Sequence, residues 1–343
     1  MHLTGLSAPD VAIDLGSTNA VVYVRGRGIV LSEPSLVAVD ARSQTVSAVG
    51  AEAKRVRNGA GSALVVRPVR GGVITDFERT EALLKRLIQA ACRSHRAHPR
   101  LVVMSMPGGA TRVEKRAVEE ACQSAGARQA FLIGAPMAAA IGAGLPVDQA
   151  AGSMVVDIGG GTCEAAVISL GEIVVSHSVR AGGELFDEAI IKQLRRDHNL
   201  LIEPQTAEET RLAIGSTHPV DDALQIEVGG RETRSGLPGT AVLSSGAIRT
   251  SLERPVARIV QTITETLRET PPELAADIID RGLVLTGGGS LLRGLAERLR
   301  QELQLPVHLA ELPLTCVAAG SGAWLEELAT DKRIEQDIVE WAA

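Results

Sequence analysis

Aromatic residues are scarce in this chain: Trp, Tyr and Phe together make up 2% of its 343 residues. Surfaces that stack nucleic-acid bases need more aromatic side chains than that. A basic field is missing too, because 41 acidic residues outnumber 35 basic ones and the formal net charge is −6. Nonspecific nucleic-acid binding draws on phosphate neutralisation by Lys and Arg. We therefore expect no nucleic-acid partner and a core built from Val, Ile, Leu and Ala.

Cysteines are few, and none stands in a C-x-x-C or other metal-binding spacing. Such scattered cysteines predict reduced thiols rather than disulfides or a zinc site. The chain does not begin with the basic and apolar segments of a signal peptide. The uncharged stretch 129–147 contains two prolines and three glycines, so a buried helix with flanking turns explains it better than a membrane span. We expect a cytoplasmic protein.

Two common phosphate-binding motifs, the Walker A loop and G-x-G-x-x-G, are absent, which disfavours P-loop and Rossmann folds. Three other glycine-rich turns are present: Asp14-Leu-Gly-Ser-Thr-Asn19, Asp157-Ile-Gly-Gly-Gly-Thr162 and Thr286-Gly-Gly-Gly-Ser290. Glycine allows the backbone to approach a ligand and to point successive N–H groups at phosphate oxygens. An aspartate beside each of the first two turns could hold Mg²⁺.

The first two turns belong to a longer internal repeat. Segments 11–23 and 154–168 both contain an apolar strand, an Asp-aliphatic-Gly turn and a second apolar strand. Any one such turn is most simply an ordinary tight turn with a capping aspartate. Three of them at strand ends, two duplicated, favour a nucleotide-binding site made by two similar lobes that face each other.

Strands alternate with helices between and after the two copies, which predicts an α/β fold with mostly parallel sheets and helices on both faces. We expect helices at 80–92, 114–125, 184–197, 206–214 and 248–268, and short strands at 101–106, 130–133 and 283–285. Lobe I is placed at residues 1–149 plus 315–343 and lobe II at 150–314. Each lobe has a small inserted subdomain, at about 33–66 and about 183–246.

These motifs resemble the phosphate-1, phosphate-2 and adenosine motifs of the superfamily of actin, sugar kinases and heat-shock chaperones. Over nearly its whole length the chain resembles the MreB family of bacterial actin-like cell-shape proteins, including Mbl-type paralogues. The matching segments are 28–35, 67–77, 136–144, 153–162, 270–277 and 314–317. The resemblance implies a two-lobed actin-like ATPase fold, a duplicated ribonuclease H-like architecture.

The resemblance also implies ligands and roles. ATP and Mg²⁺ would be the cofactors, with Asp14 and Asp157 positioning the metal and Glu164 orienting the attacking water. The phosphates and the adenosine would be contacted by Ser17, Thr18, Asn19, Gly159, Gly160, Gly161, Thr162, Glu208, Glu209, Thr210, Arg211, Gly287, Gly288, Gly289 and Ser290. Without the rest of the site, Glu208 and Arg211 would be read as a solvated helix pair.

The chain departs from the family at the site of hydrolysis. Family members carry two glutamates before Pro-Met-Ala-Ala-Ala, and the second helps to orient water. Gly134 and Ala135 stand there in this chain, and neither side chain can accept a proton. Glu164 is retained. The resemblance therefore implies an ATP binder that is at most a slow ATPase.

A second departure concerns the membrane. Many family members insert an amphipathic N-terminal helix or an apolar loop tip. Here the N-terminus is too short for such a helix, and the loop 93–100 is basic without a large apolar residue. We expect weak or indirect membrane contact, peripheral at the inner face of the membrane. The implied partners are further copies of the chain in a filament and membrane-anchored proteins of cell-wall synthesis.

Two other functions in the same superfamily stay open at this point. A small-molecule kinase would need a catalytic aspartate acting on an acceptor hydroxyl. A chaperone ATPase is weakly supported, since no substrate-binding domain follows Ala343. Fold alone does not choose among these functions, but the full-length match favours the filament-forming protein that supports cell-wall synthesis and cell shape.

Overall fold

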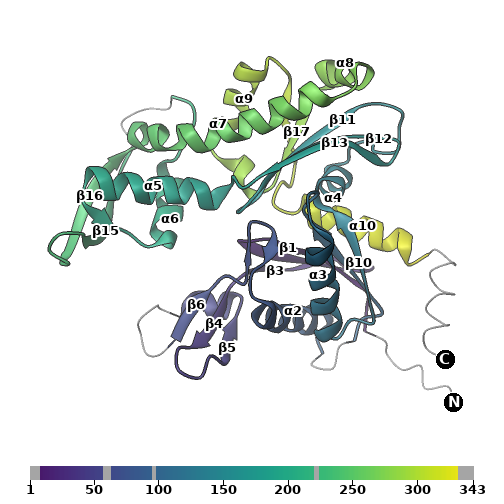
Figure 1. Cartoon of the computed structure of the whole chain (residues 1–343), viewed down its shortest axis with the longest axis horizontal. Coiled ribbons are helices and arrows are strands. Elements are labelled where there is room, and N and C mark those ends of the chain that lie inside the picture. Colours follow the sequence, from purple (N-terminus) through teal and green to yellow (C-terminus); the bar gives the residue numbers. More distant parts are fainter. Residues whose placement is uncertain (1–7, 57–62, 95–97, 220–223, 331–343) are drawn as a thin grey trace. The chain divides into compact units, whose positions relative to one another are not determined.

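The computed structural model describes residues 8–56, 63–94, 98–219 and 224–330. The chain forms two compact units (Figure 1), and each is described by itself. Unit 1 comprises residues 1–145 and 315–343, and unit 2 comprises residues 146–314.

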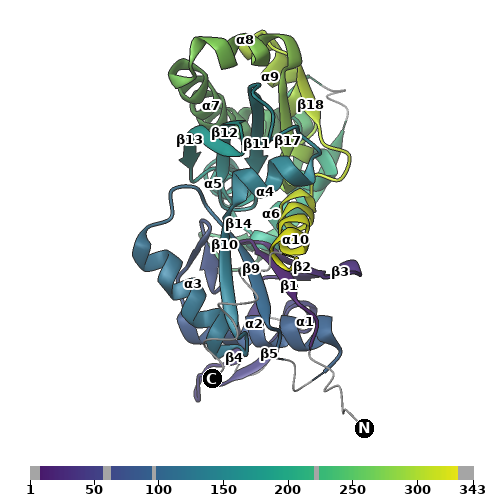
Figure 2. The same ribbon diagram turned by 90° about the vertical axis from the view of Figure 1, so that its right-hand side faces the viewer.

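The centre of unit 1 is a five-stranded sheet in the order β10-β9-β1-β2-β3. The strand β9 is buried at all six residues, as expected for a strand covered on both faces. Helices α2 and α3 pack against one face and α4 and α10 against the other (Figure 2). The bounds are β1 Val11–Leu15, β2 Asn19–Val24, β3 Gly28–Pro34, β9 Leu101–Met106, β10 Gln129–Gly134, α2 Phe77–Cys92, α3 Arg112–Ser124, α4 Ala135–Gly142 and α10 Cys316–Leu328.

Unit 2 repeats this sheet. Its strand order, β13-β12-β11-β17-β18, corresponds position by position to β3-β2-β1-β9-β10. One hydrophobic core joins the sheet to helices α5 to α9. The bounds are β11 Ser153–Ile158, β12 Cys163–Ser169, β13 Glu172–Val179, β17 Leu283–Thr286, β18 Val307–Leu309, α5 Gly183–Asp197, α6 Pro204–Ile214, α7 Ser245–Glu269, α8 Pro272–Arg281 and α9 Leu295–Leu303.

The expectation of mostly parallel sheets is wrong. In unit 1, β1 pairs parallel with β9 and β9 with β10, but β1, β2 and β3 pair antiparallel. Unit 2 has the same mixture. The reason lies in the connections: the first three strands of each unit follow one another through short turns, which join antiparallel strands, whereas a parallel pair needs a crossover. The helices and strands expected from periodicity are confirmed within a few residues.

A small three-stranded sheet accompanies each large one. Strands β4 (Val37–Asp40), β5 (Val46–Val49) and β6 (Ala63–Val66) form the sheet of unit 1, with the short helix α1 (Ala51–Arg55) beside it. Strands β14 (Leu200–Leu201), β15 (Gln225–Glu232) and β16 (Pro238–Ser244) form that of unit 2. A two-stranded hairpin of β7 (Val69–Arg70) and β8 (Val73–Ile74) leads back from β6 to α2.

Helices α4 and α10 pack unusually closely, through glycine. A Cβ added at Gly142 would lie 1.9 Å from the carbonyl oxygen of Cys316, and one added at Gly320 would lie 1.8 Å from that of Ala138. Most of the uncharged stretch 129–147 thus forms β10 and α4, with β10 in the sheet and α4 against α10. Within the described ranges, no helix combines the length and apolarity that a bilayer crossing requires.

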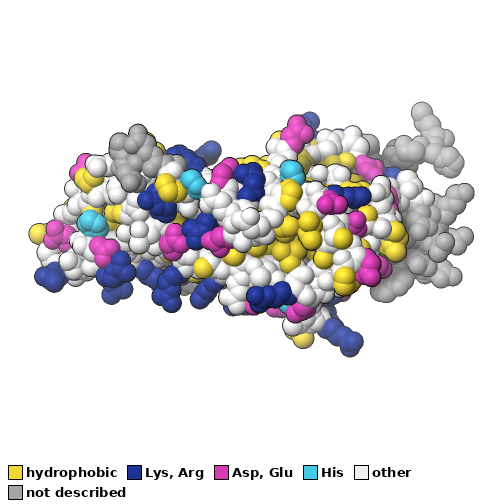
Figure 3. All heavy atoms as spheres, turned by 90° about the horizontal axis from the view of Figure 1, so that it is seen from above, with side chains coloured by type: hydrophobic (Ala, Val, Ile, Leu, Met, Phe, Trp, Pro, Cys, Tyr) yellow, Lys and Arg dark blue, Asp and Glu magenta, His cyan; other side chains and the backbone are white. Residues whose placement is uncertain are grey.

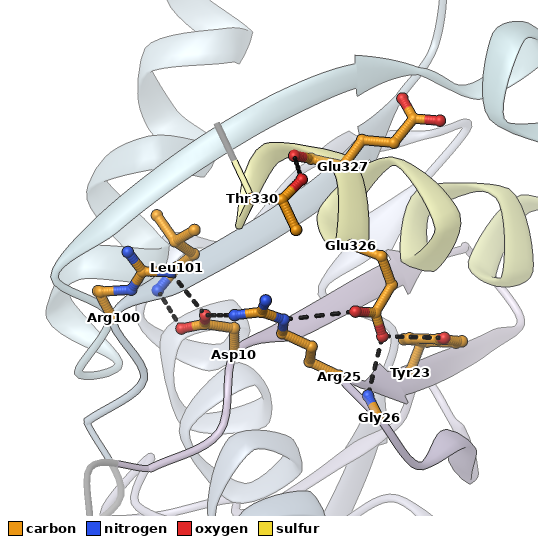
Figure 4. A network of polar contacts seen from close by, with 9 residues as sticks. All are labelled: Asp10, Tyr23, Arg25, Gly26, Arg100, Leu101, Glu326, Glu327 and Thr330. Carbon is orange, nitrogen blue, oxygen red and sulfur yellow. Dashed lines mark hydrogen bonds and ion pairs between the residues drawn. The ribbon is translucent and has the colours of Figure 1, made fainter. Parts of the chain in front are cut away.

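A chain of polar contacts fastens the end of α10 to the sheet of unit 1 (Figure 4). Asp10 accepts hydrogen bonds from Leu101 N at 2.9 Å and from Arg100 Nη2 at 3.1 Å. Arg25 lies between Asp10 and Glu326, and Glu326 Oε1 accepts from Gly26 N at 2.8 Å. Arg100 therefore already has an acidic partner within the fold.

An ion pair buried in unit 2 joins α5 to α6. Arg211 Nε lies 2.7 Å from Asp187 Oδ1, and Arg211 Nη2 lies 3.4 Å from Asp187 Oδ2. Arg211 is only 8% exposed. The bidentate geometry is the strong form of this interaction.

The surface of unit 2 over α7 and α9 carries both signs of charge. Basic and acidic side chains are interspersed on the face shown in Figure 3. Arg298 of α9, for example, pairs with Glu253 of α7 at 3.0 Å and with Glu302 of its own helix.

The close contact of α4 and α10 makes a first prediction. Gly320→Ala would stabilise an isolated helix by about 1 kcal/mol, but here the added methyl group overlaps the carbonyl of Ala138. We expect the free energy of unfolding to fall by about 3 kcal/mol, the upper end for an overpacked core, measured by urea titration with circular dichroism. Gly109→Ala, where a Cβ would meet nothing within 4 Å, should change stability by less than about 0.5 kcal/mol. A Gly320→Ala protein as stable as wild type would contradict the close packing.

The ion pair between Arg211 and Asp187 gives a second prediction. Arg211→Met removes the guanidinium that makes two contacts with the Asp187 carboxylate, which should lower the free energy of unfolding by about 3 kcal/mol. The double variant with Asp187→Leu removes both charges and should be more stable than the sum of the two single effects predicts. Arg258→Met, at an exposed position of α7, is the matched control. Additive effects in this double-mutant cycle would show that the pair is not coupled.

Candidate functional site

The first glycine turn connects β1 to β2 in unit 1. Gly16 N–H donates to the carbonyl oxygen of Asn19 at 3.1 Å and closes the turn. A Cβ at Gly16 would lie 2.8 Å from that same oxygen, so the closure depends on glycine.

The carbonyl groups of this turn are tied back into the unit. Ser35 Oγ donates to Gly16 O at 2.6 Å, and Arg67 Nη1 donates to Ser17 O at 2.9 Å. In a trans peptide the C=O of one residue and the N–H of the next point in opposite directions. The N–H groups of Ser17 and Thr18 must therefore point away from Ser35 and Arg67. Neither donates to a backbone carbonyl among the described residues, and successive outward N–H groups suit an anion.

The second turn, in unit 2, is closed in the same way, but different groups hold its carbonyls. We call the hydrogen bonds from α5 to these carbonyls the brace of the turn. Gly159 N–H donates to Thr162 O at 2.8 Å. The first N–H groups of α5 hold its carbonyls: Gly183 N donates to Gly159 O at 3.1 Å, and Glu184 N to Gly160 O at 2.8 Å. By the same geometry, the N–H groups of Gly160 and Gly161 point away from α5.

Gly182 makes this brace possible. A Cβ there would lie 2.4 Å from Gly159 O and 2.8 Å from Gly160 O. Only glycine lets the start of α5 come close enough to hold the turn.

Four polar side chains form a row across the sheet of unit 2. The pairing register places Thr286, Asp157, Glu164 and Ser178 opposite one another on β17, β11, β12 and β13, so they share one face. Thr286 Oγ1 donates to Asp157 Oδ1 at 2.8 Å, and Ser178 Oγ donates to Glu164 Oε1 at 3.3 Å. Glu164 is 3% exposed. The row therefore places two carboxylates opposite each other, that of Asp157 on β11 and that of Glu164 on β12.

Burial raises the pKa of the Asp157 carboxyl above its ordinary value, and the hydrogen bond from Thr286 opposes that rise. A bound cation would also lower the pKa of Asp157, as the hydrogen bond from Thr286 does, because both favour the ionised carboxylate. The oxygen chemistry of Asp157 therefore suits a hard divalent cation.

Unit 1 repeats only part of this row. Ser105 Oγ donates to Asp14 Oδ1 at 2.8 Å, as Thr286 does to Asp157. The residue opposite Asp14 on β2 is Val21, where unit 2 has Glu164. The two units thus share the aspartate and the hydroxyl, but only unit 2 has the glutamate.

The third turn packs directly on the second. Gly287 has φ of 78° and donates its N–H to Pro313 O at 2.8 Å. A Cβ at Gly287 would lie 2.4 Å from Ile158 O, and one at Gly289 would lie 2.5 Å from Ile158 Cγ2. Ser290 Oγ donates to Gly287 O at 2.6 Å. The turns 158–162 and 287–290 are therefore neighbours, which sequence order alone does not reveal.

The remaining expected residues lie on α6. Thr210 donates its hydroxyl to Thr206 O at 2.7 Å, and the exposed Glu209 accepts from Gln205 Nε2 at 2.9 Å. Glu208 is half-buried, and Arg211 is paired with Asp187. Arg211 Nη2 would lie 3.4 Å from a Cβ on Gly183, so its guanidinium adjoins the start of α5 that braces the second turn.

Within the described part of the chain, no cluster of three or more His, Cys, Asp or Glu side chains could hold a metal by itself. Proteins commonly hold Mg²⁺ through one or two carboxylates together with phosphate oxygens and water. The carboxylate of Asp157 and that of Asp14 offer this donor set, each at the end of the central strand of its own unit.

At the site of the missing glutamates, β10 ends at Gly134 and α4 begins at Ala135. The first turn of α4 contains no acidic residue. The helix start therefore offers no side chain that could orient water.

Sequence reasoning missed four residues of this arrangement: Ser35, Arg67, Ser105 and Gly182. Ser35 and Arg67 stood in matching segments without a role. Ser105 is a polar residue in an otherwise apolar strand, and the Gly182-Gly183 pair precedes a helix. Both patterns can be seen in the sequence. The residues that Ser105 and Gly182 contact, Asp14 and the turn 159–160, are however distant in the sequence.

Comparison with known proteins agrees with this architecture. The family model of the MreB/Mbl protein matches residues 8–333. The cell shape-determining protein MreB of Escherichia coli K12 is 50% identical over 329 residues, covering 94% of both chains.

Solved structures show the same fold. MreB5 of Spiroplasma citri bound to AMPPNP superposes with a TM-score of 0.88 at 34% identity, over 96% of this chain and 98% of that one. The MamK double helical filament superposes with a TM-score of 0.78 at 21% identity, over 93% and 99%; at that identity the likeness concerns the fold alone. The chain therefore has the actin-like fold and belongs to the MreB/Mbl family.

Proposed function

We propose that this chain is a nucleotide-dependent cytoskeletal protein that binds ATP with Mg²⁺, polymerises into filaments and supports cell-wall synthesis and cell shape. The observation that carries this proposal is the pair of glycine turns whose carbonyls are tied back, leaving successive N–H groups directed outward in both units. Its relative MreB5 of S. citri was solved with AMPPNP, an ATP analogue.

Particular residues would hold the nucleotide. The N–H groups of residues 17–18 and 160–161 would donate to phosphate oxygens, and the hydroxyls of Ser17, Thr18 and Thr162 lie in the same turns. Asp14 and Asp157 would hold Mg²⁺, which neutralises phosphate charge when bound. The turn 287–290, which packs on the phosphate turn, and residues 208–211 of α6 would contact the adenosine.

Filament formation is supported by the fold shared with the MamK filament, and a role in cell shape by the MreB of E. coli. Further copies of the chain are the proposed primary partner, with membrane-anchored cell-wall synthesis proteins as the second. We place the protein in the cytoplasm, peripheral to the inner face of the membrane.

Direct lipid contact would be weak. Arg100 is occupied by Asp10, Arg96 lies outside the described residues, and Arg93 is exposed. Each free basic residue near an anionic surface contributes about 1 kcal/mol. The loop 93–100 thus contributes less lipid-binding free energy than three free arginines would, which favours attachment through partner proteins.

Hydrolysis would be slow. Glu164 is retained beside Asp157, but Ala135 cannot orient water. A positioned general base or water-orienting group typically contributes about 10²–10⁴ in rate, or about 3–5 kcal/mol of barrier. Phosphate binding uses other residues, so binding and turnover should separate.

Electron microscopy tests the function directly: purified protein should form filaments with Mg-ATP and not without nucleotide. Asp157→Ala removes one proposed Mg²⁺ carboxylate and should weaken binding of a fluorescent ATP analogue with Mg²⁺ by at least about tenfold. Asp280→Ala, at an exposed position of α8, should bind as wild type does. A folded Asp157→Ala protein with unchanged affinity would refute the site, and phosphate transfer to an added sugar acceptor would indicate a kinase instead.

Slow hydrolysis is tested by restoring the glutamate. Ala135→Glu should raise phosphate release at least about tenfold at saturating ATP and equal amounts of polymer. Ala135→Leu adds a side chain of similar length that can neither hydrogen-bond water nor act as a base, so it should release phosphate at close to the wild-type rate. Equal rates for all three proteins would show that water is positioned without residue 135.

A further inference from the structure

The aspartate that ends the central strand of each unit has a hydroxyl partner from the neighbouring parallel strand. In unit 1 this is Ser105 of β9, and in unit 2 it is Thr286 of β17. Both hydroxyls donate to the Oδ1 atom of their aspartate, at 2.8 Å. Ser105 is 9% exposed and Thr286 is fully buried.

Three buried threonines in and next to α7 behave differently. Thr262, Thr266 and Thr270 each donate to the main-chain carbonyl four residues earlier in α7 or at its end, at 2.7–2.9 Å. That is the ordinary local solution for a buried hydroxyl in a helix. Ser105 and Thr286 instead reach a carboxylate 91 and 129 residues away in sequence.

Both units have this hydrogen bond from a hydroxyl to the aspartate, although the residues around it differ. One hydroxyl comes from Ser and the other from Thr, and the cross-strand neighbour of the aspartate is Val21 in unit 1 but Glu164 in unit 2. What both units keep is a hydrogen bond that sets the rotation of a carboxylate about its Cβ–Cγ bond. Mg²⁺ demands nearly ideal ligand geometry, and hydrogen-bond partners behind a carboxylate commonly orient it for a metal.

We propose that Ser105 and Thr286 are positioning residues that hold the carboxylates of Asp14 and Asp157 in the orientation that receives nucleotide-bound Mg²⁺. This inference rests on the proposed function and adds two residues to its site. Neither hydroxyl needs to touch the nucleotide or the metal.

The test compares nucleotide binding with and without the metal. Thr286→Val keeps the side-chain shape and removes the hydroxyl, and Thr286→Ser keeps the hydroxyl. Affinity for a fluorescent ATP analogue is measured in Mg²⁺ and again in EDTA. Thr286→Val should bind about 10–100-fold more weakly in Mg²⁺ and within about twofold of wild type in EDTA, while Thr286→Ser should stay close to wild type in both. Ser105→Ala, with Ser105→Thr as its rescue, gives an independent pair in the other unit.

Thr262→Val is the matched control, because it removes a buried hydroxyl of the same unit that bonds to a helix carbonyl; it should leave both affinities unchanged. Equal loss in Mg²⁺ and EDTA for Thr286→Val and Ser105→Ala would mean a packing role and would overturn the proposal. So would wild-type affinity in both folded variants. If Thr286→Val fails to fold, the Ser105 pair decides the question. A wild-type chain that binds no nucleotide overturns the proposed function itself, and this inference with it.

Discussion

Hydrogen bonds to the carbonyl oxygens of two glycine turns shape the rest of the candidate site. A peptide unit is rigid, so holding its C=O also aims the N–H on its other side. In unit 1 the holders are Ser35 and Arg67, and in unit 2 they are the first N–H groups of α5. Different residues thus produce the same outward-facing amides. The brace in unit 2 further requires Gly182, since any Cβ there would push α5 away from the turn.

The repeated sheet explains why the two halves can share a task and still differ. Equal strand order places one aspartate at the end of each central strand, beside a hydroxyl from the next parallel strand. The two units differ at the residue opposite this aspartate on the neighbouring antiparallel strand, which is Val21 in unit 1 and Glu164 in unit 2. The two units therefore share an aspartate with a hydroxyl partner, whereas only unit 2 places a second carboxylate opposite that aspartate.

Much of the local structure followed from periodicity. Helix α2 repeats buried Leu and Ile along one face and is capped by Asp76, whose side chain accepts from Arg79 N. Helix α3 begins with a capping box of Thr111 and Glu114. Sheet direction was misjudged, because alternating strands and helices suggested parallel pairing while the short turns after β1 and β11 impose antiparallel pairs. Arg211 was expected to contact the nucleotide, with a solvated helix pair as the alternative if the rest of the site were missing. In the structure it is 8% exposed and pairs with Asp187 on another helix, a contact that no local pattern encodes.

By itself, the sequence determined the parts whose causes are local. These are the glycines that permit tight turns, the aspartates at strand ends, the repeat that implies two similar units, and the lack of a glutamate at Ala135. The tertiary structure decided which distant groups meet those parts: Ser105 with Asp14, Arg67 with the carbonyl of Ser17, and Gly289 with Ile158. Turn formation depends on the conformational freedom of a few adjacent residues. The aim of an N–H group or a carboxylate depends instead on hydrogen bonds from strands and helices that only folding brings together.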